Sequence, residues 1–104
     1  MALVLVRKVI MARLIHPDGT EEYVFPLGKK WTLKEFQNHV GGFIEFVSFI
    51  RSFRMIVDEE GLLKNKLVNE TATEMVTEAL RGKELRYQPV IVGDVLILDK
   101  GEKF

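Results

Sequence analysis

The sequence predicts an α+β domain: a small antiparallel or mixed sheet of about five strands, with two short helices packed on one face. Three observations lead to this prediction. Two pairs of apolar, β-branched segments are each joined by a short turn, as in β-hairpins. Two further segments carry apolar residues at helical spacing. The 104 residues, 47% of them hydrophobic, match one domain with a buried core, so we expect residues 1–104 to form a single domain.

The first predicted hairpin covers residues 3–25. Residues 3–15 are mostly apolar and rich in β-branched side chains, and residues 21–25 follow as the returning strand. The turn between them contains Pro17-Asp18-Gly19, in which proline presets φ and glycine adopts a positive φ without steric cost. These two strands should therefore pair antiparallel.

The first predicted helix begins after Thr32 and ends at Gly41-Gly42. Glu35 follows Thr32 by three residues, which is the spacing of a capping box. Trp31 and Phe36 occupy the two positions of a hydrophobic staple around this start. At the other end, a glycine can take the left-handed conformation that closes a helix. Local residues therefore predict both ends of this helix.

The remaining residues predict a second hairpin, a second helix and a last strand. The expected elements are a strand over 43–50 that is apolar on both faces, a turn at Arg51-Ser52, a strand over 53–57 ended by Asp58-Glu59-Glu60-Gly61, a loop over 62–68, a helix from Asn69 or Thr71 to Gly82, and strands over 90–92 and 95–98 separated by Gly93-Asp94.

Composition argues against several classes of protein. With 15 basic and 15 acidic residues the formal net charge is zero, which disfavours a general coating of nucleic acid. The absence of cysteine removes disulfides, thiolate zinc sites and cysteine nucleophiles, and it fits a reducing compartment. The two histidines lack a metal-binding spacing, so no metal and no other cofactor is expected.

Two further features concern the setting of the protein. No apolar run is long enough to span a membrane, and the apolar start is interpreted as a strand and not a signal peptide, so we expect a cytoplasmic protein without membrane contact. Glutamate outnumbers aspartate and glutamine is scarce, which favours a thermophilic source.

Three segments in order resemble a known family. They are Val-Gly-Gly-Phe-Ile-Glu at 40–45, Val-Asp-Glu-Glu-Gly-Leu-Leu-Lys at 57–64 and Ile-Val-Gly-Asp-Val-Leu-Ile at 91–97. This pattern resembles the DUF3846 family of uncharacterised proteins, which are common in phages, plasmids and other mobile elements. The family commonly has a proline-rich loop after the lysine, whereas residues 65–69 here keep asparagines and lack prolines. The resemblance implies a viral or mobile-element setting and no particular activity.

The candidate ligand-binding residues lie around the first helix and the second hairpin. They are Lys29, Lys30, Gly41, Gly42, Glu45, Arg51 and Arg54. Gly41-Gly42 could cradle an anion or close the helix, and the second interpretation is favoured because the helix dipole repels anions at a C-terminus. The basic residues could line a groove for a nucleotide or a single strand, rim a dimer interface, or be ordinary surface charge, which is the favoured interpretation.

Glu45 lies inside an apolar strand, which raises several alternatives. A buried Glu45 could act as an acid–base residue, or it could accept hydrogen bonds from the Gly-Gly amides, from Lys29 or Lys30, or from an arginine. Alternatively, its face of the strand meets solvent or a partner chain. We favour structural pairing, with Glu45 anchoring the junction between helix and strand. The acidic run that begins at Asp58 is interpreted as a solvated turn, because it lacks the spacing of a calcium-binding loop.

Three functions follow, in order of preference. The first is a non-enzymatic interaction module that docks to a host or viral protein and forms a homodimer. The second is a binder of nucleotides or short nucleic acids that uses Arg51, Arg54 and the Gly-Gly junction. The third is a small enzyme with Glu45 as the acid–base residue, helped by His39 or Asp94. We assign no catalytic residue at this stage.

Overall fold

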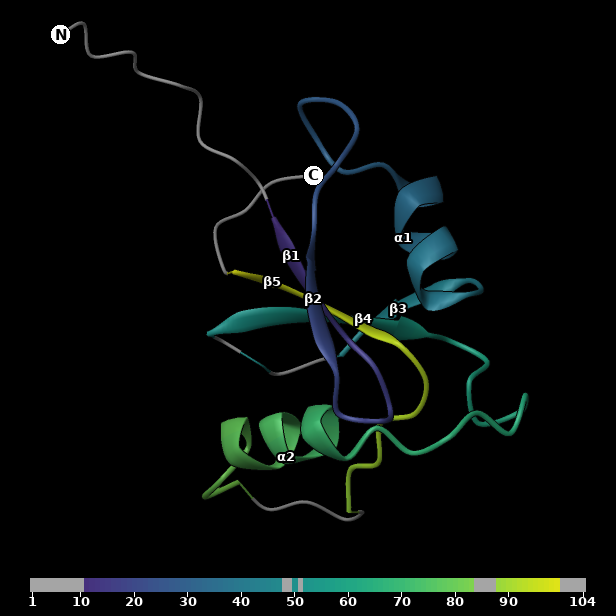
Figure 1. Ribbon diagram of the computed structural model, residues 1–104. Helices are drawn as coiled ribbons and strands as arrows, with labels where there is room; N and C mark the ends of the chain where they lie inside the picture. Colours follow the sequence, from purple (N-terminus) through teal and green to yellow (C-terminus); the bar gives the residue numbers. More distant parts are fainter. Residues whose placement is uncertain (1–10, 48–49, 51, 84–87, 100–104) are drawn as a thin grey trace, which may run out of the picture.

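Figure 1 shows the computed structural model of the chain, in which residues 11–47, 50, 52–83 and 88–99 are described. The α+β class, the five strands and the two helices are confirmed. The predicted strand residues 3–10 and the predicted turn residue Arg51 lie outside the described residues. In chain order the elements are β1 (Ala12–Ile15), β2 (Glu21–Val24), α1 (Leu33–Val40), β3 (Ile44–Phe46), β4 (Phe53–Asp58), α2 (Glu70–Ala79) and β5 (Val95–Asp99).

The five strands form one sheet in the order β2-β1-β5-β4-β3. The two predicted hairpins are β1–β2 and β3–β4, and β5 lies between them (Figure 1). Because β5 pairs antiparallel with β1 on one side and with β4 on the other, the whole sheet is antiparallel and the mixed alternative is excluded. Among the described strands, β2 and β3 form the two edges of this sheet.

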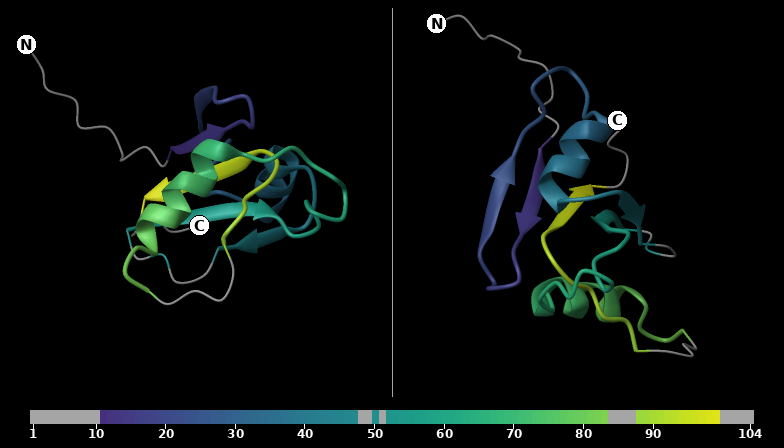
Figure 2. Two further views of the ribbon diagram at one scale, coloured as in Figure 1. Left: turned by 90° about the horizontal axis from the view of Figure 1, so that it is seen from below. Right: turned by 90° about the vertical axis from the view of Figure 1, so that its right-hand side faces the viewer.

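The two helices cover opposite faces of the sheet (Figures 1 and 2), whereas we predicted both on one face. Phe36 and Val40 of α1 belong to one cluster of buried side chains, and Ala72 and Val76 of α2 belong to the other. In β4, an interior strand, Ile56 faces α1, whereas its neighbours Met55 and Val57 face α2. A strand that is apolar on both faces needs cover on both, and one helix on each side provides it. Neither helix has the length and apolar character needed to cross a membrane.

The predicted ends of α1 are confirmed. Thr32 and Glu35 form a capping box, with the Thr32 side chain accepting a hydrogen bond from the Glu35 amide. The rings of Trp31 and Phe36 stack with their centroids 5.5 Å apart, as a hydrophobic staple requires. Gly41 closes the helix with φ of +83°, a conformation that other residues adopt only with strain.

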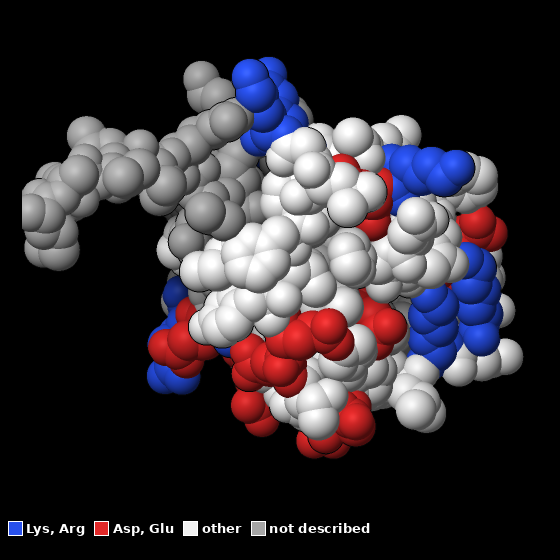
Figure 3. All heavy atoms as spheres, turned by 45° about the horizontal axis from the view of Figure 1, so that its top comes forward, with Lys and Arg blue, Asp and Glu red and all other residues white. Residues whose placement is uncertain are grey.

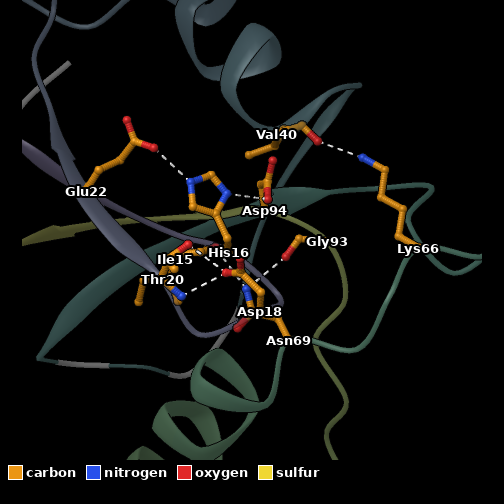
Figure 4. Close-up of polar contacts among 10 residues, drawn as sticks. All are labelled: Ile15, His16, Asp18, Thr20, Glu22, Val40, Lys66, Asn69, Gly93 and Asp94. Carbon is orange, nitrogen blue, oxygen red and sulfur yellow. Dashed lines mark hydrogen bonds and ion pairs between the residues drawn. The ribbon is translucent and has the colours of Figure 1, made fainter.

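Asn69 begins α2 and joins this helix to the sheet. Its side chain oxygen accepts a hydrogen bond from the Ala72 amide, so the helix starts at Asn69 and not at Thr71. Its Nδ2 donates to the carbonyl oxygens of Ile15 and Gly93, each at 2.9 Å (Figure 4). Because Asn69 is fully buried, these three bonds satisfy a polar group that would otherwise destabilise the core.

The last two predicted elements and the second hairpin differ in detail. β3 covers Ile44–Phe46 of the expected 43–50, of which residues 48–49 lie outside the described part of the chain. β5 covers Val95–Asp99, close to the predicted 95–98, whereas the predicted strand over 90–92 is not formed. Upstream of β5, Val92 forms an isolated bridge with Val68, and Gly93 has φ of +76°. The Gly93-Asp94 interruption predicted from the sequence is therefore present, and the residues before it do not join the sheet as a full strand.

Candidate functional site

Gly41 and Gly42 connect α1 to β3, and their amides are used within the chain. Both N–H groups donate to the carbonyl oxygen of Gln37, at 2.8 and 3.2 Å. These bonds close the last turn of α1, which confirms the favoured interpretation of the pair as a helix end. A role in binding a ligand stays a prediction.

A buried carboxylate, Asp58 at the end of β4, holds this junction in place. Its Oδ2 forms ion pairs with the Nζ atoms of Lys64 and Lys66, at 2.9 and 2.6 Å, and its Oδ1 accepts a hydrogen bond from the Glu60 amide at 2.8 Å. Asp58 is only 5% exposed, so each of its oxygens needs such a partner.

The same two lysines also reach the end of α1. Lys66 donates to the carbonyl oxygen of Val40 at 2.7 Å (Figure 4), and Lys64 donates to that of Gly41 at 3.2 Å. Cations are favoured at a helix C-terminus, where carbonyl groups lack partners within the helix. The loop after β4 is thereby tied both to the sheet, through Asp58, and to α1.

Gly42 lies directly against this ion-pair cluster. A Cβ atom at position 42 would come within 2.5 Å of the Lys64 Nζ and within 2.7 Å of an Asp58 carboxylate oxygen. Real Cβ atoms do not come this close to other atoms, so any other residue at position 42 would displace the Lys64 ammonium and the Asp58 carboxylate. The second glycine of the pair thus serves packing, while the first serves backbone conformation.

The ion pairs control the protonation of Asp58. Burial alone would raise its pKa, but hydrogen bonds from Lys66, Lys64 and the Glu60 amide outweigh burial and lower the pKa from 3.8 to about 2. Asp58 is therefore charged at neutral pH, and the charge is compensated by the two lysines.

Glu45 does not anchor the junction, contrary to our expectation. It is exposed, and among the residues that the structure describes its carboxylate has no hydrogen bond or ion pair. The anchoring carboxylate is Asp58, which we had interpreted as part of a solvated turn. The sequence carries one indication of this role, since Lys64 and Lys66 follow Asp58 in a short loop.

The remaining predicted residues are not gathered in one place. Lys29 and Lys30 are exposed and precede α1, whereas Gly41-Gly42 follows it, and a helix of eight residues is about 12 Å long. Arg54 is half-buried near the start of β4, at the other end of that strand from Asp58. Arg51 lies outside the described residues. Ligand binding by these residues stays a prediction.

The side of β3 that faces away from β4 forms an open edge among the described strands. On the α1 face of this edge lies a groove of about 320 Å³ with five apolar lining residues. They are Trp31, Leu33, Phe36, Ile44 and Phe46. Leu33 is 57% exposed and Phe46 42% exposed, so part of the groove wall is in contact with solvent. Figure 3, in which the top of Figure 1 is turned toward the viewer, shows a broad central area of uncharged side chains, with Lys and Arg above and to the right of it and Asp and Glu below it.

A second pocket, of about 280 Å³, lies on the other face of the same strand. Its lining combines apolar side chains with carboxylates, among them Val47, Val57, Glu45 and Glu59. Neither Glu45 nor Glu59 forms an ion pair with a described residue. The β3 edge is therefore flanked by an apolar groove on one face and by a partly acidic pocket on the other.

Comparison with known families identifies the family of this chain. The model of the family described as "Domain of unknown function (DUF3846)" matches residues 11–104. The chain belongs to the DUF3846 family. No curated protein and no solved structure matches it.

Two of the segments on which the DUF3846 resemblance rests meet in space. Lys64, from the second segment, donates a hydrogen bond to the carbonyl oxygen of Gly41, from the first, and Gly42 leaves no room for a Cβ atom beside Lys64 and Asp58. The ion-pair cluster thus joins these two segments of the DUF3846 chain at one end of β3. Over the part of the DUF3846 chain that is described, no group of three or more His, Asp or Glu side chains is arranged to hold a metal ion.

Proposed function

We propose that this DUF3846 protein is a protein-interaction module that binds its partner at the β3 edge. One observation carries the proposal: the edge strand β3 has a pocket on each face, immediately beside its open side. Edge strands bind extended segments by adding them to the sheet, with main-chain hydrogen bonds for affinity and pockets on each face for selectivity.

Exposed apolar side chains around β3 support the same proposal. Phe43 is 64% exposed immediately before the strand, Phe46 lies within it, and Leu33 faces the groove from α1. Scattered exposed apolar residues are ordinary, but several of them beside an open strand edge are typical of a surface that binds protein.

The setting of this interaction is a further part of the proposal. The resemblance to proteins of mobile elements supports a host or viral protein as the partner, in the cytoplasm of the host. The other occupant to be tested is a second copy of the chain, which would bind at the β3 edge and form a homodimer.

Substitutions at the two sheet edges test the proposal. Leu33→Glu places a charge in the β3 groove at an exposed position, and Tyr23→Glu is the matched control on β2, where the side chain is 62% exposed. The tagged wild-type protein and both variants are used to capture partners from a host-like lysate, and each is sized by light scattering. We expect Leu33→Glu to lose the partner, or the second copy, and Tyr23→Glu to retain it. Equal capture and equal mass for all three proteins would contradict the proposal.

A further inference from the structure

We infer that the segment bound at β3 is an extended chain with apolar residues at alternate positions and a lysine or arginine between them. This inference rests on the proposed function and specifies the chemistry of the partner. It follows from the register of β3, from the lining of the two pockets and from the charge of Glu45.

The hydrogen bonds of β3 show which backbone groups face the open side. The carbonyl oxygen of Phe43 accepts from the Glu59 amide at 2.7 Å, and the Val47 amide donates to Met55 at 2.9 Å. Both bonds point toward β4. Because backbone groups alternate in direction along an antiparallel strand, the N–H and C=O of Ile44 point to the open side. An added strand therefore forms its hydrogen bonds with Ile44.

Side chains of the added strand alternate between the two faces in the same way. Ile44 packs in the cluster on the α1 face, whereas Glu45 pairs with Val57, which belongs to the cluster on the α2 face. Every second residue of an added strand therefore lies on the face of the apolar groove. The residues between them lie on the opposite face, where Glu45 is. The groove is lined by apolar and aromatic side chains, so the residues beside it should be apolar.

The residue beside Glu45 should be basic. Since Ile44 takes the hydrogen-bonded position on the open side, Glu45 takes the non-hydrogen-bonded position, where facing side chains come closest. Glu45 and Glu59 are exposed in the pocket on this face without a described ion pair. The third carboxylate, Asp58, is already compensated by Lys64 and Lys66. Among the described residues, the uncompensated charge beside the edge is therefore negative.

The test uses a phage-displayed library of random dodecapeptides, selected in parallel on the wild-type protein and on variants. Glu45→Gln removes the charge and Glu45→Lys reverses it, both at an exposed position, while Tyr23→Glu is the control at the β2 edge. We expect the wild-type protein and the control to enrich alternating apolar residues with an intervening Lys or Arg. On Glu45→Lys the intervening residue should change to Asp or Glu, with the apolar alternation retained.

Affinities of the enriched peptides provide the second measurement. A wild-type-selected peptide should bind Glu45→Gln roughly two- to fivefold more weakly, as expected for one exposed cross-strand charge pair. The loss should diminish at high salt, because exposed charges are screened. Thermal unfolding of each variant verifies that the fold is retained.

The outcomes separate this inference from the proposed function. Alternating apolar residues without a basic preference, or a preference unchanged in Glu45→Lys, would overturn the inference and leave β3 as the binding edge. Enriched peptides that bind Leu33→Glu as well as wild type would overturn the proposed function itself. A failure to enrich any peptide, or a wild-type dimer that Leu33→Glu dissociates, would overturn the inference, because the occupant would then be a folded surface or a second copy.

Discussion

The two edges of the sheet differ in how their side chains are used. On β2, Glu21 forms an ion pair with Arg13 at 2.6 Å and Glu22 one with His16 at 2.9 Å, so its acidic residues are paired within the first hairpin. On β3, Glu45 has no partner among the described residues. Exposed apolar side chains lie at both edges, Tyr23 and Phe25 at β2 and Phe43 and Phe46 at β3. Charged residues on an edge strand discourage the addition of further strands, and an apolar edge promotes it.

The comparison indicates that the acidic side chains of β2 are compensated within the chain, whereas Glu45 at β3 is not compensated by any described residue. This difference lies in the side chains of the two edge strands. The edges also differ in the polar groups that lie next to them. His16 bonds to Glu22 and Asp94 beside β2, and Asp58 pairs with Lys64 and Lys66 beside β3. The following predictions change these polar groups, in order of decreasing effect on stability.

The largest effect is expected for Asp58→Ala. The substitution leaves Lys64 and Lys66 without their carboxylate and releases the loop that ties β4 to α1, which should lower the free energy of unfolding by about 3 kcal/mol. Chemical denaturation measures the loss. Glu59→Ala, at the exposed neighbouring position, is the matched control and should cost less than about 0.5 kcal/mol.

Acid unfolding gives an independent check on the same group. Because the folded-state pKa of Asp58 is lowered to about 2, its contribution to stability is fully present above its ordinary pKa of 3.8 and is lost as the pH falls through about 2. Stability of the wild-type protein should therefore fall across this range more steeply than that of Asp58→Asn. If the stability of the two proteins fell in parallel with pH, the ion pairs of Asp58 would contribute nothing to stability.

A smaller effect is expected for Gly42→Ala. The added methyl group would meet the Lys64 ammonium and the Asp58 carboxylate, and displacing them should cost about 1–3 kcal/mol. Gly28→Ala is the matched control, because no atom lies within 4 Å of a Cβ at that position and its φ is not in the left-handed region. Thermal melts of the two variants should differ clearly, and equal melting temperatures would refute the close approach at Gly42.

The smallest effect is expected on the β2 side, from His16→Ala. Hydrogen bonds to Glu22 and then to Asp94 raise the pKa of His16 above its ordinary value of 6.5 (Figure 4). The stabilisation is therefore fully present below pH 6.5 and is lost as the pH rises through the raised pKa. The variant should be less stable than wild type by about 0.5 kcal/mol near pH 5 and by less near pH 8. A difference in melting temperature that grows with pH would contradict this assignment.

The sequence predicts features of this fold that depend on neighbouring residues. Thr32 with Glu35, Trp31 with Phe36, and Gly41 all act within one helix, and the structure confirms each of them. Their interactions span five residues or fewer, so no tertiary contact is needed to recognise them.

The features that sequence analysis missed depend on register across the sheet. The contact of Asp58 with Gly42 exists because β3 pairs with β4 so that Ile44 lies opposite Asp58. Likewise, the exposure of Glu45 depends on β3 being an edge, which follows from the insertion of β5 between the hairpins. No local pattern indicates either of these two facts.

The central position of β5 has a consequence for how the protein is made. The chain leaves the ribosome from its N-terminus, so both hairpins are synthesised before the strand that joins them. At roughly 5–20 residues per second, several seconds of translation separate the end of β4 from the end of β5. Throughout that interval β1 and β4 each lack the neighbour that later covers one of their edges. The nascent protein therefore has unpaired strands, β1 and β4, at what becomes the middle of its sheet. Once β5 pairs with both of them, β2 and β3 are the edges of the described sheet.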